Sequence, residues 1–531
     1  MTAGHQRPRP EGWQVGAFAL SQIVVMLLAI SNESLWIDEF WTAHFGAMES
    51  FKTFYDLLVV PSGSQTPLHF LHFYLWGLFS PAGEFFFRLA NLPLFVAGQL
   101  AIFWALRDYP RQFAWLFLTL SALHPMVWQY ANEARPYIMM YAGAQMILAY
   151  LLHLHAASAK GRSAEPFFLA LFVVGGILLF GASMLGAFWV FAASVFVLVH
   201  HLRRSIWREL FRGVNPLLVG FMLLATGVLT AYYLNSLLKG AGASRLASST
   251  PSTVLFAIYE VLGLAGIGPS RLELRTVGVT AVAPYATGLA AAGAVLVMVL
   301  FIGLKEARAR LGTRELFWLT ALGLFPIVVV VFSGFAMHWR VLGRHLIAAL
   351  PLLNLLWALG LATLLQTNGR PGRHWHWHWR WLLAASALLF LLWSSCALRF
   401  AEHHRKDDYR AAAALAQTAV AQGQKVWWAA DVIGARYYGL PGEFDVLGEL
   451  TGMHKPLPCS DRPGVQAVAN ASRQCLLTLS VPDMVILSKP ETFDISADIA
   501  GYLTAGKFTM AQRLPAFTIW LRSAPVAMQT R

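Results

Sequence analysis

Residues 13–40 read WQVGAFALSQIVVMLLAISNESLWIDEF, an apolar run from Trp13 to Ser31 followed by two adjacent acids, Asp38 and Glu39. An α-helix needs about 20 apolar residues to cross about 30 Å of hydrocarbon. The run is longer than a signal-peptide core and no small-residue cleavage site follows it, which indicates a retained membrane helix. The two acids are therefore expected at a membrane surface.

The composition of the whole chain is that of a membrane protein. Of its 531 residues, 57% are hydrophobic and 13% are charged, and the mean hydropathy is +0.54. The net charge of +13 is carried by small basic clusters between apolar segments, which indicates topology and not nucleic-acid binding. We predict an α-helical polytopic membrane protein with the lipid bilayer as its partner and no nucleic acid.

The apolar segments predict about eleven transmembrane helices. The predicted spans are residues 13–31, 84–106, 112–131, 137–155, 166–181, 184–201, 215–235, 282–304, 316–335, 345–365 and 381–399.

Basic residues in short loops predict the orientation, because Lys and Arg near span ends stay in the cytoplasm. With a cytoplasmic N-terminus, every predicted cytoplasmic loop is basic, and the C-terminus of this multi-pass plasma (inner) membrane protein is extracytoplasmic. The basic residues are Arg7, Arg9, Arg107, Arg111, Lys160, Arg162, Arg203, Arg204, Arg208, Arg212, Lys305, Arg308, Arg310, Arg314, Arg370, Arg373 and Arg380.

The first outer loop, about 32–83, is expected to hold juxtamembrane helices. The apolar stripe Trp41, Phe45, Met48, Phe51, Tyr55 and Leu58 has helical spacing. The segment Pro67–Phe79 is too short to span, so we predict a helix flat on the outer leaflet with Thr66 as N-cap and Pro67 at its first position. A re-entrant helix is the alternative. Residues 254–267 predict a third surface helix.

Beyond Arg399 the composition becomes that of a soluble domain. Asp408–Gln422 is helical in pattern, and Val426–Ala430, Met484–Leu487 and Phe517–Leu521 predict strands. We therefore expect a membrane module over 1–399 and a small extracytoplasmic α/β domain over 400–531. Cys459 and Cys475 both fall in this domain and are able to form a disulfide outside the cytoplasm.

Three groups of polar residues carry the candidate chemistry. Asp38 with Glu39 offers a general base toward a hydroxyl acceptor, although acids also begin surface helices, where they favour the N-terminal dipole. Glu133-Ala134-Arg135-Pro136-Tyr137 places a guanidinium beside a carboxylate on the same predicted face, which suits a phosphate. Arg340, Arg344 and His345 break the positive-inside pattern of an outer loop, which also suits a lipid phosphate. Snorkelling side chains are the alternative for both arginine groups.

The sequence has no Walker-type phosphate loop, no dinucleotide fingerprint and no Ser-centred nucleophile elbow. Soluble nucleotide donors are on the wrong side of the membrane for Asp38. An activated donor at this face is therefore most simply lipid-linked.

The motifs together resemble those of the GT-C membrane glycosyltransferases related to dolichyl-phosphate-mannose protein mannosyltransferases and to the aminoarabinose transferase that acts on lipid A. The resemblance is strong over the first 150 residues and mainly one of layout beyond them. The matching motifs, in order, are Leu35-Trp36-Ile37-Asp38-Glu39, Thr66-Pro67-Leu68-His69-Phe70, Gly83-Glu84 with Arg88-Leu89, His124-Pro125, Glu133-Ala134-Arg135-Pro136-Tyr137, Arg344-His345 and Asp408-Tyr409-Arg410.

This resemblance implies a GT-C-like fold and a hexosyl- or pentosyltransferase activity. Such an enzyme moves a sugar from a polyprenyl-phosphate donor to a hydroxyl or phosphate of a glycan, lipid or protein acceptor at the extracytoplasmic face. Asp38 is similar to the catalytic base of the family and Glu39 to its usual neighbour. Arg135 and Arg344 are expected to hold the carrier phosphate. The other candidate substrate-binding residues are Arg88, Glu133, Tyr137, His69 and His345.

The chain departs from many relatives before Pro67, where it has Gln65-Thr66, and this leaves the sugar open. No metal ligand is assigned. A divalent cation held by His69 and His72 is an open alternative, and a helical aromatic surface explains these histidines equally well.

Two other classes of protein compete with this interpretation. A lipid or sugar transporter or flippase also has many spans with polar residues, but transporters usually show repeated halves and charge near the bilayer midplane. A non-enzymatic assembly or sensor protein would use its outer domain to bind a partner. Transfer of label from a polyprenyl-phosphate sugar separates the three.

Overall fold

The computed structural model describes residues 11–60, 66–161, 165–203, 216–240, 248–366, 374–446, 459–462 and 464–522. The chain divides into two compact units. The helical unit comprises Met1–Ser31, Phe51–Pro81 and Phe85–His404, and the α/β unit comprises Asn32–Ser50, Ala82–Glu84 and Arg405–Arg531. The first outer loop therefore contributes to both units, and Asp38 belongs to the α/β unit.

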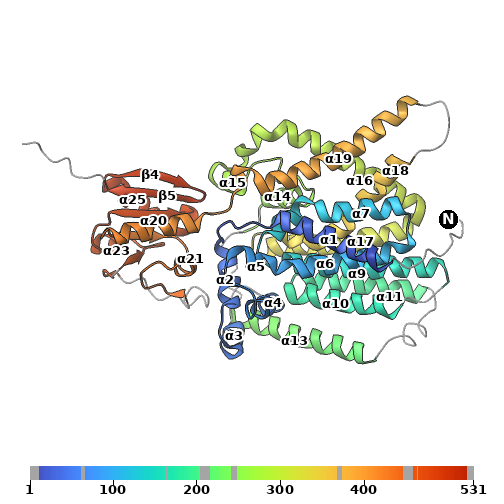
Figure 1. The fold of residues 1–531 in the computed structure, drawn as a ribbon, viewed down its shortest axis with the longest axis horizontal. Helices are drawn as coiled ribbons and strands as arrows, with labels where there is room; N and C mark the ends of the chain where they lie inside the picture. Colours follow the sequence, from blue (N-terminus) through green and yellow to red (C-terminus); the bar gives the residue numbers. More distant parts are fainter. Residues whose placement is uncertain are drawn as a thin grey trace, which may run out of the picture. The chain divides into compact units, whose positions relative to one another are not determined.

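The helical unit is a bundle whose long helices run alongside one another (Figure 1). Eight helical stretches among the described residues are long and apolar enough to cross a membrane, so the predicted α-helical polytopic class is confirmed. The longer helices are α1 (Gly12–Ala29), α6 (Asn91–Ala105), α7 (Arg111–Leu123), α9 (Tyr137–Ala159), α10 (Pro166–Ala182), α11 (Gly186–Arg203), α13 (Pro216–Gly240), α16 (Ala286–Leu311), α17 (Thr313–Ala336), α18 (Leu350–Leu365) and α19 (His374–Phe400).

Shorter helices connect and cover the bundle. They are α3 (Phe51–Leu58), α4 (Pro67–Gly77), α5 (Glu84–Leu89, whose first residue belongs to the α/β unit), η1 (Leu106–Asp108), α8 (Pro125–Ala131), α14 (Pro251–Val261), α15 (Arg271–Val277), η2 (Gly278–Tyr285), η3 (Gly343–Ala349) and η4 (Glu402–His404).

Each of the eleven predicted spans coincides with helix, but three are shorter than a full span. α10 has 17 residues, and the part of α11 counted as apolar is Gly186–His200. The predicted span 112–131 is broken into α7 and α8, because His124 is extended and Pro125 starts a new helix. The His124 ring accepts a hydrogen bond from the Met126 amide and so caps α8.

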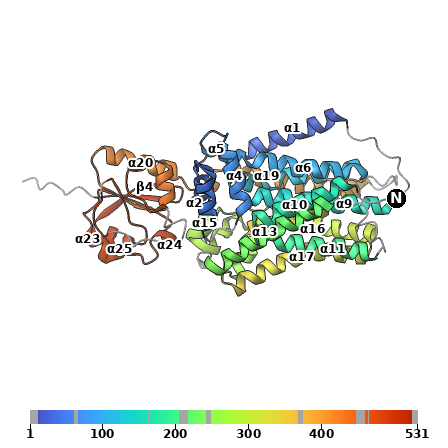
Figure 2. The same cartoon turned by 90° about the horizontal axis from the view of Figure 1, so that it is seen from below.

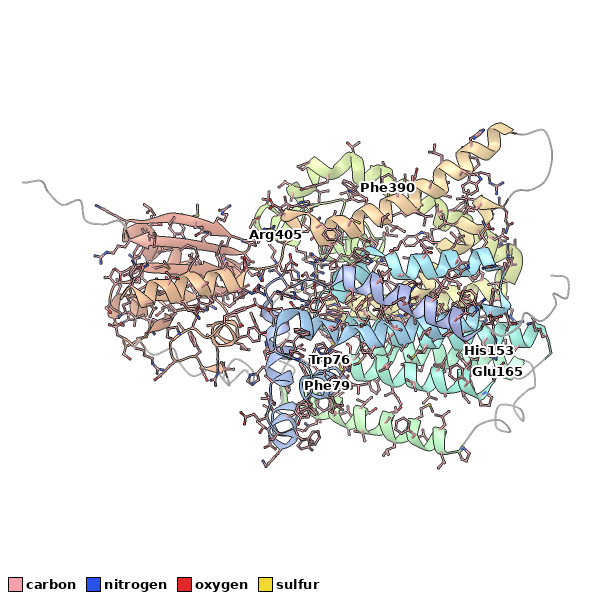
Figure 3. All side chains as sticks on the ribbon, in the orientation of Figure 1. Trp76, Phe79, His153, Glu165, Phe390 and Arg405 are labelled. Carbon is pink, nitrogen blue, oxygen red and sulfur yellow. A yellow bond between two sulfur atoms is a disulfide. The ribbon has the colours of Figure 1, made fainter. Side chains whose placement is uncertain are left out.

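Some residues of the predicted basic loops lie outside the described residues: Arg7, Arg9, Arg162, Arg204, Arg208, Arg212, Arg370 and Arg373. The described loop residues Arg107 and Lys160 pair with Glu165 and Asp108. Figure 3 shows Glu165 and His153 at the opposite end of the bundle from Trp76 and Phe79. The Arg107 and Lys160 loops therefore share one end of the bundle, and α4 lies at the other.

Helix α9 is the centre of the helical unit, and its span is fully buried. Small residues let neighbouring helices approach it, as is usual inside membranes. A Cβ atom on Gly143 would lie 2.7 Å from the carbonyl oxygen of Gly175 on α10, and one on Gly175 would lie 2.6 Å from that of Gly143. Gly303 and Gly360 allow the same close contact between α16 and α18.

The juxtamembrane helices exist, but the stretch from Trp41 to Leu58 that was predicted as one helix is two helices. The helix breaks between α2 (Ile37–Gly46) and α3, which shifts the buried face. Phe54 and Leu57 are buried in α3, whereas Phe51 and Tyr55 are 58% and 52% exposed. Helix α4 starts with Pro67 as predicted, but Thr66 makes no side-chain capping hydrogen bond. Helix α14 (Pro251–Val261) overlaps the predicted third surface helix, 254–267, and begins shortly before it.

The α/β unit is built on a five-stranded sheet in the order β2-β1-β3-β5-β4. Strands β1 (Val426–Ala429), β3 (Met484–Ser488) and β5 (Phe517–Arg522) agree with the prediction, whereas β2 (Val465–Ala467) and β4 (Phe508–Leu514) were not predicted. β1 is parallel to β2 and β3, and β5 is antiparallel to β3 and β4.

Helix α20 (Tyr409–Ala421) lies on one face of this sheet and α23 (Arg473–Thr478), α24 (Pro490–Phe493) and α25 (Asp498–Ala505) lie on the other (Figure 2). Trp427 and Trp428 of β1 are fully buried, and alternation along the strand puts them in different cores. Trp427 packs with Tyr502, and Trp428 packs with Tyr409. Cys459 and Cys475 form a disulfide, as the sequence allowed.

Candidate active site

Asp38 and Glu39 lie in the first turn of α2, in the α/β unit. The helix dipole favours ionised carboxylates at this end. The two side chains have different surroundings, since Glu39 is 0% exposed and Asp38 is partly exposed. The Glu39 carboxylate pairs with the Lys406 ammonium at 3.2 Å. Of the two acids, Asp38 is therefore the more exposed.

The segment before α2 is fixed by polar contacts within the α/β unit. The Tyr438 hydroxyl accepts a hydrogen bond from the Leu35 amide and donates one to the Glu84 carboxylate, both at 3.0 Å. Glu84 also pairs with the Arg410 guanidinium at 2.6 Å. Burial raises the pKa of the Tyr438 phenol well above its ordinary value, so the phenol stays protonated as a donor. The Gly83-Glu84 and Asp408-Tyr409-Arg410 motifs are thus joined in space.

Apolar contacts fix α2 from its other side. The Phe40 ring is fully buried and packs edge-on against Tyr409 at 5.0 Å between ring centroids. Gly434 of α21 (Val432–Tyr437) makes room for this ring, because a Cβ atom there would lie 2.6 Å from it. The residues around Asp38 therefore have one defined arrangement.

The helical unit holds a separate cluster of buried charges around Arg271. The Glu260 carboxylate, 1% exposed at its side chain, pairs with the Arg271 guanidinium at 2.7 Å and accepts a hydrogen bond from the Gly343 amide at 2.9 Å. Glu133 lies 3.4 Å from the same guanidinium, and the Tyr130 hydroxyl accepts from it at 2.7 Å. Glu260 thus connects α14, α15 and the start of η3.

Arg344 and Arg135 lie next to this cluster. Arg344 lies over the Tyr137 ring, 5.7 Å from its centroid, and Tyr137 packs against Tyr130. The Arg135 amide donates to the Glu133 carbonyl at 2.8 Å. The Arg135 backbone is therefore held beside Glu133, and the charge of its guanidinium acts on His69. This region of the helical unit carries three guanidinium groups, of Arg135, Arg271 and Arg344, and two carboxylates, of Glu133 and Glu260. The excess positive charge suits an anionic ligand.

Of the remaining candidates, Arg88 and His69 are fully enclosed and His345 is partly buried. Arg88 is 0% exposed and donates to the Ser31 carbonyl at 3.0 Å. His345 accepts from the Leu342 amide through its Nδ1 and caps η3. His69 is 1% exposed. Burial lowers the pKa of His69 well below its ordinary value, and the nearby charges of Arg135 and His72 lower it further, so His69 is neutral near pH 7.

The structure gives no metal-binding group of three or more His, Cys, Asp or Glu residues within the described ranges. His72, one of the two histidines considered for a divalent cation, has its Nε2 atom 2.9 Å from the Ala90 carbonyl oxygen.

Sequence reasoning missed Arg271, Glu260 and Tyr130. Arg271 lies between the predicted spans 215–235 and 282–304, a loop that the predicted orientation places outside, so it breaks the positive-inside pattern in the same way as Arg344. Glu260 is an acid within an otherwise apolar segment, and such a residue needs a partner. Both signals were present in the sequence. The pairing of the two residues required the structure.

No protein-family model matches the chain, and a search of curated proteins found no match. Among solved structures, the chain is similar to a crystal structure of ArnT from Cupriavidus metallidurans bound to undecaprenyl phosphate, with 15% identity, a TM-score of 0.49, and coverage of 97% of this chain and 98% of that one. It is also similar to the arabinofuranosyltransferase AftD from mycobacteria, with 16% identity, a TM-score of 0.41, and coverage of 98% of this chain and 42% of that one.

Proposed function

We propose that this protein is a membrane glycosyltransferase that moves a sugar from a polyprenyl-phosphate donor to an acceptor hydroxyl at the extracytoplasmic face, with Asp38 as the base. The observation that carries the proposal is the cluster of Arg271 and Arg344 with Glu133 and Glu260 in the helical unit, with Arg135 two residues after Glu133. Charged side chains inside a membrane unit are costly and usually mark a functional site.

The cluster has the chemistry of a phosphate site. Arg271 and Arg344 are each partly exposed, so both retain surface toward a ligand. The Glu260 carboxylate orients Arg271 and, through the Gly343 amide, the start of the segment that carries Arg344. A phosphodiester brings one negative charge to a group with three cations and two carboxylates. Binding would therefore neutralise the cluster.

The proposed reaction needs a base, an acceptor and a stabilised leaving group. The acceptor oxygen attacks the anomeric carbon of the sugar while the bond from that carbon to the carrier phosphate oxygen breaks. Asp38 takes the proton of the acceptor hydroxyl, and the phosphate leaves with the bonding electrons. Arg135, Arg271 and Arg344 stabilise the charge that grows on this phosphate. A single displacement of this kind inverts the anomeric centre.

The test compares Asp38→Asn with the wild type in purified, nanodisc-embedded protein. The probes are undecaprenyl phosphates that carry a tritiated hexose or pentose, offered with an envelope extract as acceptor. We expect wild-type protein to move label out of the lipid-phosphate fraction, and Asp38→Asn to lower kcat by about 10²- to 10⁴-fold, the usual contribution of a general base. The KM for the donor should change little.

Glu49→Gln is the matched control, because Glu49 is an exposed acid in the same unit. It should transfer at the wild-type rate. Near-normal transfer by Asp38→Asn, with a melting temperature equal to that of the wild type, would remove Asp38 from the role of base. If wild-type protein transfers label from none of the donors but carries them across vesicle membranes, the protein is a transporter.

A further inference from the structure

Four consecutive charged residues, 405–408, begin the C-terminal part of the α/β unit, and three of them, Lys406, Asp407 and Asp408, have the following partners in that unit. The Lys406 ammonium lies 3.2 Å from the Glu39 carboxylate. Asp407 pairs with Lys489. Asp408 accepts a hydrogen bond from the Ala411 amide at 3.0 Å and caps α20. The chain is therefore fixed as soon as it leaves the helical unit at His404.

Glu39 is enclosed in this arrangement. It has no exposed surface, and the Lys406 side chain retains 15%. The same Glu39 oxygen that faces Lys406 lies 3.4 Å from the Trp36 amide, which donates to it. A carboxylate enclosed in this way does not reach an acceptor, but it does join the first turn of α2 to residue 406.

A second contact holds the other side of this turn. Lys489 is 5% exposed and its ammonium lies 6.0 Å from the centroid of the Trp36 ring. Its backbone is left-handed, with φ of 37°, which is unusual for a residue other than glycine. Glu39 follows Asp38 directly and Trp36 precedes it by two residues, so lysines of the C-terminal segment contact the chain on both sides of the proposed base.

We propose that Lys406 is a positioning residue that fixes the first turn of α2 through Glu39 and thereby aims the Asp38 carboxylate. This proposal rests on the proposed function for its effect on catalysis, but not for its effect on the structure of α2. It assigns Glu39 a supporting role in place of a second base. Loss of the lysine would remove the ion pair at 3.2 Å from a fully buried carboxylate, which loosens the turn.

The test uses full-length protein in nanodiscs and the variants Lys406→Met, Lys406→Arg and the double variant Glu39→Gln/Lys406→Met. Lys425→Met is the matched control, because Lys425 pairs with Asp461 at 2.6 Å elsewhere in the same unit. Two quantities are measured: hydrogen exchange of the α2 amides, and kcat and KM with a tritiated undecaprenyl-phosphate sugar that the wild type uses.

We expect Lys406→Met to speed exchange in α2 by about tenfold or more, because local opening no longer breaks a buried ion pair. Its kcat should fall by about 10- to 100-fold with an unchanged KM, as expected for a misplaced base. Lys406→Arg should restore both quantities to within about threefold, since it keeps the charge. Lys425→Met should leave both at the wild-type values.

The double variant distinguishes positioning from catalysis by Glu39. With both charges removed, no buried charge is left unpaired, so exchange should slow and kcat should rise relative to Lys406→Met. A double variant with lower kcat than Lys406→Met overturns the proposal, as does a Lys406→Met variant with unchanged exchange or with a raised KM and normal kcat. If wild-type protein transfers no label, the proposed function fails while the exchange data still decide whether Lys406 fixes α2.

Discussion

The strongest prediction for the helical unit is that removing Glu260 stabilises the protein once Arg271 has been removed. In the native chain Glu260 has a side-chain exposure of 1% and relies on the Arg271 guanidinium at 2.7 Å. Arg271→Met removes that cation and leaves the carboxylate buried. Glu260→Gln in the same background then removes the unpaired charge.

The magnitudes follow from burial. Breaking a buried ion pair by deleting one partner costs about 3–5 kcal/mol. The Arg271 side chain is 33% exposed, so water screens part of the loss, and we expect about 2–3 kcal/mol for Arg271→Met. Glu260→Gln alone should cost about 1.5–3 kcal/mol, the value of hydrogen bonds to a charged group. The double variant should be about 1–2 kcal/mol more stable than Arg271→Met.

The assay is the free energy of unfolding from SDS titration in mixed micelles, analysed as a double-mutant cycle. Lys52→Met is the control, because its pair with Asp56 at 2.5 Å is highly exposed and should contribute at most about 0.5 kcal/mol. A double variant that is less stable than Arg271→Met, with the two losses simply adding, would refute the argument that Glu260 depends on Arg271.

Two further predictions concern pH and covalent structure. Burial and the neighbouring His403 lower the pKa of His404 from 6.5 to about 4. The unfolded chain therefore binds this proton more tightly than the folded protein does. The free energy of unfolding should be highest above pH 6.5 and should fall by about 2–3 kcal/mol as the pH drops toward 4. His404→Gln should flatten this pH dependence of the unfolding midpoint, and an unchanged slope would contradict it. The disulfide joins cysteines that are 16 residues apart in the sequence. The double variant Cys459→Ser/Cys475→Ser should therefore destabilise the α/β unit by about 3 kcal/mol. The control variant Cys396→Ser, at the free cysteine, should change the melting temperature of that unit little.

The transmembrane helices could be predicted from the sequence because a span requires only length and apolar character. All eleven segments coincide with helix, including short ones. The break at His124-Pro125 was not predicted, although proline disfavours the interior of a helix. It was missed because the surrounding residues are apolar on both sides, and hydropathy does not register a break in the backbone. Hydropathy alone therefore predicts the number of segments better than their continuity.

The break between α2 and α3 and the edge strands β2 and β4 were not predicted, for a different reason. Helical spacing across Trp41–Leu58 assumed one continuous helix, and the break after Gly46 rotated the buried face to Phe54 and Leu57. Strand β4 is mostly exposed and β2 has three residues, so neither has a buried apolar pattern. Both are defined by pairing with a neighbouring strand, which depends on contacts distant in the sequence.

In the candidate site, the positive-inside pattern was applied to Arg344 but not to Arg271. Arg344 was selected because positive charge in a predicted outer loop has no role in orientation. The same reasoning applies to Arg271, and the acid that it requires is Glu260, ten or so residues upstream. The motif resemblance identifies Arg135 but not Arg271 or Glu260, because neither of these two residues belongs to a matching motif. Arg271 shows that a charge which breaks the topological pattern of a membrane protein can be paired with a buried residue of opposite sign. A search for such a partner finds residues that motif comparison leaves out.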